Sequence, residues 1–305
     1  MGGHLAEGFR DAGWLVRAVV RPGSTKALPA GVESVTAGLD SASLARAIEG
    51  CDVLVHAAGV TRAARASAYD AVNVAGTRAA TEAANTTGAR LILISSQAAI
   101  GAGTIERPAR EDDVPRPLTA YGRSKVAAEE VVRTAGRTPW TIIRPVSVYG
   151  PRDRQFVPLF RLASRGVFLQ TSRPSTPYTF IYVSDLVTGV VLAASSPRAV
   201  GQAMFFGHAK PLTADELLRS LANVFGRRYR PWRVPALAAV AWAGEVSWLC
   251  GKEPPLDRAR LVELRAEGFV CSTDRARQLL GFSASVSLED GIERTARWYR
   301  AQGWL

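Results

Sequence analysis

The stretch Thr119–Lys125 (TAYGRSK) places a tyrosine and a lysine four residues apart, at Tyr121 and Lys125. In a helix, residues with this spacing lie on one face, one turn from each other. An ammonium group at that position stabilises a phenolate and lowers the tyrosine pKa from its ordinary value of about 10. A tyrosine tuned in this way can give a proton to a carbonyl or take one from an alcohol.

The surrounding sequence bears on whether this pair has a function. The pattern Y-x-x-x-K alone is also what an exposed helical pair without a role would show. The chain, however, has four lysines in all, at positions 26, 125, 210 and 252, so a chance pairing is less expected than usual. The apolar stretch Leu91–Ser96 (LILISS) predicts a strand that ends in a serine before the pair, and Trp140–Pro145 (WTIIRP) predicts another strand after it.

Further motifs accompany the pair along the chain. They are GGHL (Gly2–Leu5), DVLVHAAG (Asp52–Gly59), NVAGT (Asn73–Thr77), SSQAAIG (Ser95–Gly101), YGRSK (Tyr121–Lys125), IIRPVSVYGPRD (Ile142–Asp153) and FIYVSDLV (Phe180–Val187). With them, the chain resembles the extended short-chain dehydrogenases/reductases, the group that contains NAD(P)-dependent sugar epimerases, dehydratases and hydroxysteroid or flavonol reductases. The motifs follow the family's order from residue 2 to about residue 190.

The resemblance implies an α/β fold, a Rossmann-type doubly wound parallel sheet with a smaller C-terminal substrate-binding lobe. We expect residues 1–155 to form the dinucleotide-binding domain, with residues 179–200 packed onto it. Residues 156–178 and 201–305 are expected to form the substrate-binding lobe. No low-complexity linker separates the two parts, which favours a lobe built directly onto the sheet.

The resemblance also makes the start of the chain unusual. A dinucleotide-binding unit opens with a strand and a Gly-rich loop before its first helix, and Gly2 matches the third glycine of that loop. The first strand and most of the Gly-rich loop are then absent, and we expect an N-terminal truncation caused by a start codon assigned too late. A plain helix start with a flexible Gly2-Gly3 is the alternative. Upstream DNA that encodes an in-frame strand ending in T-G-x-x-G-F, or similar, would support the truncation.

The same resemblance implies that Ser96, Tyr121 and Lys125 are the catalytic residues. Ser96 would bond the reacting oxygen, Tyr121 would move the proton, and Lys125 would lower the Tyr121 pKa and bond the nicotinamide ribose. Plainer alternatives exist, because a serine that ends a strand is a common turn former and Asn73 could cap a helix. The residues expected to contact the cofactor are Gly2, Arg21, Ala57, Ala58, Gly59, Asn73, Ser95, Tyr121, Lys125, Pro145 and Val148.

One position bears on the choice between NAD and NADP. The residue that closes the second strand, about 20 positions after the glycine loop, usually touches the adenosine ribose. Here it is Arg21, with Ser24 and Lys26 nearby, which favours the 2′-phosphate of NADP(H) and leaves NAD(H) as the alternative. A solvated arginine in an arginine-rich chain is the plainer explanation. Ala37 stands where many relatives carry an aspartate that contacts the adenine region.

These features predict an NAD(P)-dependent oxidoreductase that transfers hydride between nicotinamide and a secondary alcohol or its ketone, with NADP(H) preferred. A nucleotide-sugar epimerase that uses the same three residues is one alternative, and a non-catalytic NADP-binding homologue is another. A dehydratase is disfavoured because Gln97 follows Ser96, where that branch uses an additional acid or base.

The amino-acid composition limits the kinds of partner that the protein is expected to bind. The formal charge of +11 is compatible with nucleic acid, yet no nucleic-acid-binding motif accompanies it. Three widely spaced cysteines and three histidines predict neither a disulfide framework nor a metal site, and favour a cytoplasmic protein.

The apolar run Val234–Leu249 is shorter than the ~20 residues that span a bilayer. Flanked by the basic segment Arg227–Arg233, it predicts a buried helix first, peripheral contact with the inner face of a membrane second and a site for a substrate phosphate third. An apolar small-molecule substrate and a homodimer are both compatible with the sequence.

Overall fold

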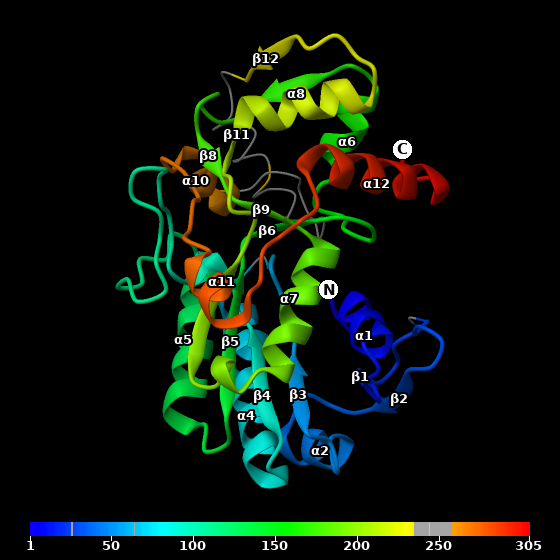
Figure 1. Ribbon diagram of the computed structural model, residues 1–305, viewed down its shortest axis with the longest axis vertical. Coiled ribbons are helices and arrows are strands. Elements are labelled where there is room, and N and C mark those ends of the chain that lie inside the picture. The colour runs from blue at the N-terminus through cyan, green and yellow to red at the C-terminus, as the bar shows by residue number, and fades with distance from the viewer. Residues whose placement is uncertain (26, 64, 235–243, 245–257) are drawn as a thin grey trace.

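Four parallel strands form the central sheet of the computed structural model, which describes residues 1–25, 27–63, 65–234, 244 and 258–305. The strand order is β10–β5–β4–β3, and Figure 1 shows β5, β4 and β3 side by side. The register aligns Leu91 with Trp140 and Met204 with Ile143. The strands are β3 (Val53–His56), β4 (Arg90–Ile94), β5 (Trp140–Pro145) and β10 (Gln202–Phe206).

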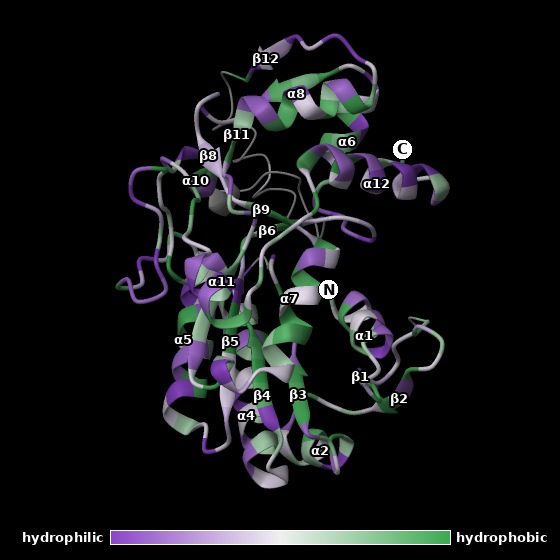
Figure 2. Ribbon diagram, viewed as in Figure 1, coloured by the Kyte–Doolittle hydropathy of each residue, from purple (hydrophilic) through white to green (hydrophobic). Residues whose placement is uncertain are grey.

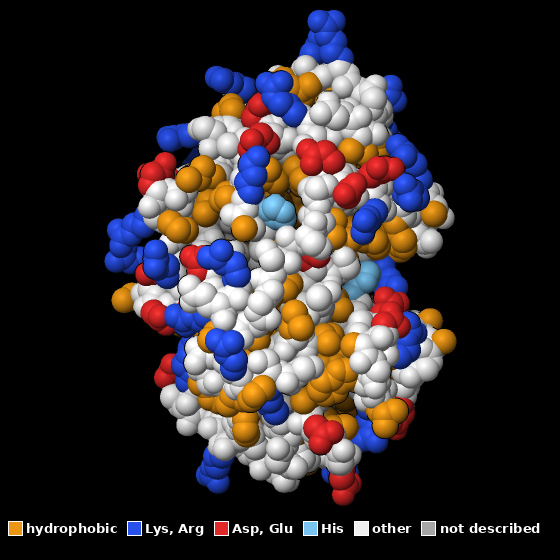
Figure 3. Space-filling model, in the orientation of Figure 1, with side chains coloured by type: hydrophobic (Ala, Val, Ile, Leu, Met, Phe, Trp, Pro, Cys, Tyr) orange, Lys and Arg blue, Asp and Glu red, His pale blue; other side chains and the backbone are white. Residues whose placement is uncertain are grey.

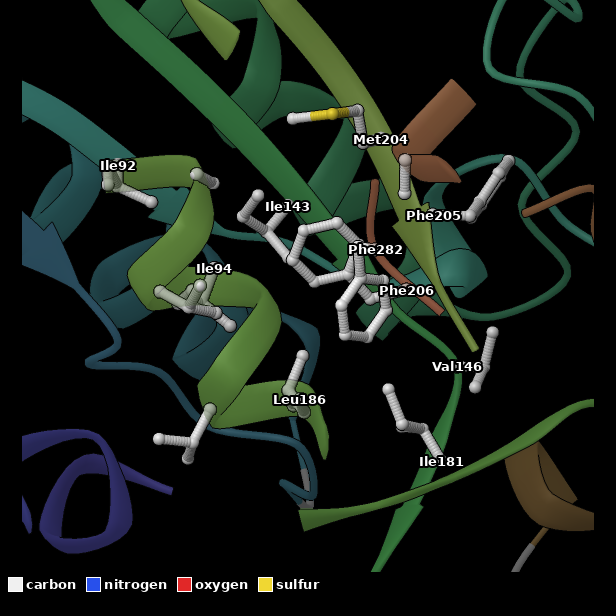
Figure 4. Packing of buried hydrophobic residues seen from close by; sticks show 14 of the residues in the cluster. Ile92, Ile94, Ile143, Val146, Ile181, Leu186, Met204, Phe205, Phe206 and Phe282 are labelled. Atoms are coloured by element: carbon white, nitrogen blue, oxygen red, sulfur yellow. The ribbon is translucent and has the colours of Figure 1, made fainter. Parts of the chain in front are cut away.

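Helices cover both faces of this sheet. Successive strand residues point to opposite faces, and in residues 91–94 of β4 both sets are apolar and buried. On one face, strand residues pack with α7 (Val183–Ser195) and α1 (Gly2–Asp11), as Figure 4 shows for Ile92, Ile143 and Leu186. On the other face, they pack with α4 (Ala75–Thr87) and α5 (Ala120–Ala135). Figure 2 shows β3, β4 and most of α7 as hydrophobic. The predicted Rossmann-type, doubly wound fold is confirmed.

A separate two-stranded parallel sheet lies beside the central one. It pairs β1 (Arg17–Val20) with β2 (Glu33–Thr36). The helix α2 (Ser41–Ala47) follows β2 and packs against α4. Within the described part of the chain, no ladder joins β1 to β3.

The C-terminal lobe is built around an aromatic core. Phe160, Phe168 and Tyr299 are almost completely buried there and contact one another or neighbouring rings. Its helices are α6 (Val157–Ser164), α8 (Ala214–Val224) and α12 (Leu288–Ala301), and β7 (Phe168–Gln170) pairs with β12 (Pro231–Arg233). Short ladders at the junction pair β6 (Ser147–Tyr149) with β9 (Phe180–Tyr182), and β8 (Pro177–Tyr178) with β11 (Leu212–Thr213).

The boundary expected at residue 201 cuts through the central sheet and needs correction. The strand β10 pairs with β5 along its whole length, because Met204, Phe205 and Phe206 are buried in the same core as the other strands. The helix α11 (Asp274–Leu280) also returns to this core through Ala276. Part of the segment 201–305 therefore belongs to the Rossmann-type domain.

The helical segment that carries Asn73 has an irregular start. A short helix α3 (Ala66–Tyr69) leads into a π-helical turn, η1 (Asp70–Val74), before α4 begins. Such wide turns are rare and occur mostly at functional sites. Here the turn carries Asn73, whose side chain is buried.

The positive charge is dispersed on the face shown in Figure 3. Lys and Arg side chains lie at its outline and across it, interspersed with acidic residues. No helix in the part of the chain that the structure describes is long and apolar enough to cross a membrane. Most of the apolar run 234–249 lies outside the described residues.

A buried ion pair joins α5 to the central sheet. The Glu129 carboxylate accepts hydrogen bonds from Arg144 of β5 at 2.9 and 2.7 Å and from the Ser95 hydroxyl at 2.6 Å. Arg144 also donates to the carbonyl of Glu111, and the Glu111 carboxylate accepts from the Phe205 amide of β10. Burial opposes ionisation of Glu129, but Arg144 and Ser95 outweigh it and hold the pKa of that carboxyl below its ordinary value.

We expect Arg144→Leu to lower the free energy of unfolding by about 3–5 kcal/mol, because it leaves the Glu129 carboxylate buried without its main partner. Glu129→Leu/Arg144→Leu should be less destabilised than Arg144→Leu alone, since no uncompensated charge remains. Chemical denaturation measures both differences.

Arg297→Leu is the matched control, because Arg297 pairs with Glu293 on the exposed face of α12. Its loss should cost about 0–1 kcal/mol. Equal effects of the buried and the exposed arginine would refute the importance given to the buried pair.

Candidate active site

The amino end of α5 presses against the turn that follows β4. Thr119 caps the helix by accepting a hydrogen bond from the Gly122 amide at 3.1 Å. Gly122 faces the carbonyl of Ala98, and a Cβ atom there would lie 2.4 Å from that oxygen. A side chain at position 122 would therefore push the helix away. This close packing brings Tyr121 to Ser96, which caps the short 3₁₀ turn η2 (Gln97–Ala99).

The Tyr121 hydroxyl lies near the Ser96 side chain at the carboxyl edge of the sheet. Burial of the phenol raises the pKa of Tyr121 to about 12, although the Ser96 hydroxyl acts in the opposite direction. Desolvation of the phenolate is the largest influence on this pKa, and the expected lowering by Lys125 stays a prediction. At neutral pH, Tyr121 is thus a protonated hydroxyl.

Lys125 lies one turn further along α5 and is buried. Its Nζ atom donates to the carbonyl of Ile94 at 3.0 Å and lies 5.9 Å from the centre of the Tyr121 ring. Burial lowers the pKa of Lys125 to about 8, against a raising effect of Glu129. His56 is buried nearby, and burial together with Lys125 lowers its pKa to about 4. A neutral histidine therefore stands beside a lysine that is mostly charged at pH 7.

Asn73 connects the loop after β3 to α5. Its side chain accepts from the Val60 amide at 2.8 Å and donates to the Val60 carbonyl at 3.0 Å. It also donates to the Ser124 hydroxyl at 2.9 Å, and that hydroxyl donates to the carbonyl of Tyr121. One amide group thus fixes the loop relative to the helix that carries Tyr121.

The loop after β3 suits a flat ligand that approaches its backbone closely. A Cβ atom on Gly59 would lie 3.0 Å from Asn73 Oδ1 and 3.5 Å from Lys125 Nζ, so a side chain at this position would crowd both polar groups. Ala57 and Ala58 precede it and add little bulk. These residues fit the nicotinamide-ribose end of a dinucleotide.

Other expected cofactor residues lie elsewhere. Ser95 is buried and donates to Glu129, so its side chain is committed to the ion-pair network. Pro145 ends β5 and is buried in the core. Val148 is half-buried and packs against both the apolar cluster of the central sheet and the aromatic cluster of the C-terminal lobe. Arg21 is exposed just after β1, and a Cβ atom on Gly2 would contact nothing within 4 Å.

Three residues of this region were missed by the sequence analysis. Tyr69 is buried with its ring 6.1 Å from that of Tyr121, and its hydroxyl accepts from the Ala63 amide. Glu129 and Glu111 form the network behind the site. An arginine inside the apolar strand WTIIRP was the available signal for a buried carboxylate, although it did not identify which one.

Asp185 lies buried in the first turn of α7, where it has a structural role. It does not cap α7, whose N-cap is Tyr182. Its carboxylate instead accepts from the amides of Ser285 and Val286 and from the Ser285 hydroxyl. It therefore anchors the segment that leads to α12.

Comparison with known proteins agrees with this geometry. The family model described as "NAD dependent epimerase/dehydratase family" matches residues 1–206. Ceramide reductase of Caulobacter vibrioides is 32% identical over 311 residues, which cover 100% of this chain and 93% of the relative. Sterol-4-alpha-carboxylate 3-dehydrogenase (decarboxylating) of Saccharomyces cerevisiae is 27% identical and covers 81% of this chain and 76% of its own length.

A solved structure has the same fold. UDP-glucuronic acid 4-epimerase from Bacillus cereus, in complex with UDP-glucuronic acid and NAD, superposes with a TM-score of 0.79 at 19% identity, over 99% of this chain and 96% of the other. The resemblance seen in the sequence is confirmed. The chain belongs to the NAD-dependent epimerase/dehydratase family and is an enzyme of the extended short-chain dehydrogenase/reductase type.

Proposed function

We propose that the protein is an oxidoreductase that prefers NADP(H) and interconverts a secondary alcohol and its ketone. The observation that carries the proposal is the placement of Ser96 near Tyr121, with the buried Lys125 one turn away. This reaction needs three groups. They are a hydroxyl that holds the reacting oxygen, a phenol that exchanges a proton with it, and a fixed cation beside the phenol.

The state of Tyr121 supports carbonyl reduction as the favoured direction. A phenol with a pKa of about 12 is protonated at neutral pH and can donate to a carbonyl oxygen. Ser96 positions that oxygen through its hydroxyl. Lys125 stabilises the phenolate that is left after the proton has moved, and holds a ribose hydroxyl. A nicotinamide cofactor, when bound, supplies the hydride for this chemistry.

Arg21 supports NADP(H) over NAD(H). It is exposed immediately after β1, where a guanidinium group can pair with a 2′-phosphate. Ser24 is exposed nearby and adds a hydroxyl. NAD(H) is the alternative, and the solved epimerase complex contains NAD.

The relatives support an apolar substrate. Two of them are named for ceramide and for a sterol carboxylate, both large lipids with a polar end. The aromatic core of the C-terminal lobe provides a scaffold for an apolar cleft. We extend the proposal to a lipid-like ketone or alcohol, handled by a cytoplasmic enzyme that contacts the membrane surface and forms a homodimer.

Two other functions are weaker candidates. A nucleotide-sugar epimerase would use the same three residues, and the fold of the solved epimerase supports it. Such an enzyme usually holds NAD tightly, so Arg21 counts against it. A non-catalytic NADP-binding homologue is disfavoured by the placement of Ser96 near Tyr121, which a sensor would not need.

Tyr121→Phe should lower kcat for ketone reduction by roughly 10²–10⁴-fold, because it removes the proton donor. Fluorescence titration should show unchanged NADPH binding, with a lower Kd for NADPH than for NADH in the unaltered protein. Tyr229→Phe, in the distant lobe, is the control and should keep full activity. Undiminished activity of Tyr121→Phe would exclude the proposed role.

Activity should fall as the pH rises through about 8, because Lys125 loses its charge there. Below this pH the ammonium is present. Above it, kcat/KM should decrease about tenfold per pH unit, as expected for one ionising group. Lys125→Arg should abolish this fall in whatever activity it retains, because a guanidinium stays charged.

The Lys125→Met variant distinguishes a role of the Lys125 charge in activity from a role in folding. It should lose activity while keeping or raising the melting temperature, because burying an ammonium group costs free energy. A pH profile of the unaltered enzyme that stays flat up to pH ~10, near the ordinary lysine pKa, would contradict the role of Lys125.

A further inference from the structure

The strand β12 lies at one end of the molecule, on the side of the C-terminal lobe that faces away from the central sheet (Figure 1). In the part of the chain that the structure describes, β12 pairs with β7 and with no other strand, so it forms an edge. Every residue of β12 is exposed, as are residues 226–228 just before it. The outer edge of this small sheet is therefore open to solvent.

A large aromatic side chain projects from this edge. Trp232 is 71% exposed. Its partner in the ladder is the half-buried Leu169, and neighbouring residues in register point to the same side of a sheet. Val167, which directly precedes β7, is also exposed. An indole ring in this position suits an interface that is apolar on one side and wet on the other.

The same edge is strongly basic. Residues 165–170 and 226–234 contain five arginines and no acidic residue. Three of them, Arg228, Arg230 and Arg233, are exposed, and among the described residues their side chains have no hydrogen-bond or ion-pair partner. This cluster differs from the face shown in Figure 3, where basic and acidic side chains are interspersed.

A carboxylate that contacts this region is already paired. Asp215, in the first turn of α8, accepts hydrogen bonds from the Tyr229 hydroxyl at 2.6 Å and from Arg219 at 2.5 Å. The ring of Tyr229 in turn packs against the buried Phe168 of β7, with 5.5 Å between the ring centres. These contacts hold the basic segment on the lobe and leave its exposed arginines available for an anionic partner.

We infer that the surface formed by Arg228, Arg230, Trp232 and Arg233, here called the basic edge, docks on a bilayer that contains anionic phospholipids. Guanidinium groups bind phosphate through paired N–H donors, and each basic residue near an anionic membrane adds to the attraction. A tryptophan beside them inserts at the level of the headgroups. Single-stranded nucleic acid is bound by a series of stacking rings along a groove, whereas this edge presents one exposed ring.

The inference rests on the proposed function for its purpose, and it gives the proposed membrane contact a location. A lipid-like ketone or alcohol resides in the bilayer, so docking there raises the concentration of substrate around the enzyme. The docking itself needs neither cofactor nor reaction, and it can be measured apart from activity.

Co-sedimentation of the full chain with vesicles tests the inference. Vesicles of phosphatidylglycerol and phosphatidylcholine in equal parts are compared with vesicles of phosphatidylcholine alone. The protein should bind the mixed vesicles and not the neutral ones. Salt at about 0.5 M should release it, because the attraction between exposed charges is screened.

Removal of the basic edge should weaken this binding. Arg228→Gln/Arg230→Gln/Arg233→Gln should lower the affinity for the mixed vesicles by about tenfold or more, because each arginine contributes to the attraction. Trp232→Ser should lower it severalfold at unchanged charge. All four side chains are exposed, so the melting temperature should stay the same.

Two controls are matched to these variants. Arg46→Gln/Arg137→Gln/Arg198→Gln removes the same charge from exposed positions in the segments that lead into β3, β5 and β10, at the end of the sheet away from the lobe. It should bind the mixed vesicles like the unaltered protein. Tyr121→Phe should also bind normally, since docking does not involve the reaction.

Equal loss of binding in both triple variants would overturn the inference, because net charge and not this edge would then be responsible. Binding of the unaltered protein to a DNA duplex but not to the mixed vesicles would also overturn it. So would self-association that Trp232→Ser abolishes in a protein that binds no vesicles. If no form binds vesicles while Tyr121→Phe loses activity as proposed, the docking inference fails and the proposed reaction stands.

Discussion

The buried pair of Glu129 and Arg144 is the interaction on which the rest of the site depends. A carboxylate and a guanidinium are costly to bury unless all their bonding groups find partners. Here Glu129 accepts from Arg144, Ser95 and Arg133, and Arg144 reaches the Glu111 carbonyl. Ser95 directly precedes Ser96, and Glu129 lies one turn beyond Lys125. The pair therefore fixes α5 against β4 and β5, and with it the position of Tyr121 relative to Ser96.

The same burial that positions the site sets its protonation states. Desolvation raises the pKa of Tyr121 to about 12 and lowers the pKa of Lys125 to about 8. A protonated phenol can donate its proton to a carbonyl oxygen, and the charged amine beside it stabilises the phenolate that remains. This is the chemistry of carbonyl reduction, and it links the packing of α5 to the direction of reaction that we propose.

The elements of the fold could largely be predicted from the sequence, because apolar periodicity and capping residues act locally. LILISS and WTIIRP became β4 and β5, and Thr119 caps α5. Properties that depend on distant packing could not be predicted. The raised pKa of Tyr121 results from burial by other segments, the Glu129 partner of Arg144 had no sequence signal, and β10 joined the sheet across the boundary placed at residue 201. The π-helical turn before α4 likewise could not be predicted, because the α-helical period of apolar residues does not reveal it.

The ionisation of Tyr121 tests the central claim most directly, because it reports the proton donor itself. Carbon-13 labelling of the tyrosine ring carbon that bears the hydroxyl gives one NMR signal for each of the seven tyrosines. Comparison with Tyr121→Phe identifies the signal of interest. The account predicts that Tyr121 stays protonated up to at least pH ~10, the ordinary tyrosine pKa. A phenolate signal from Tyr121 that appears near neutral pH would contradict a neutral donor held by burial.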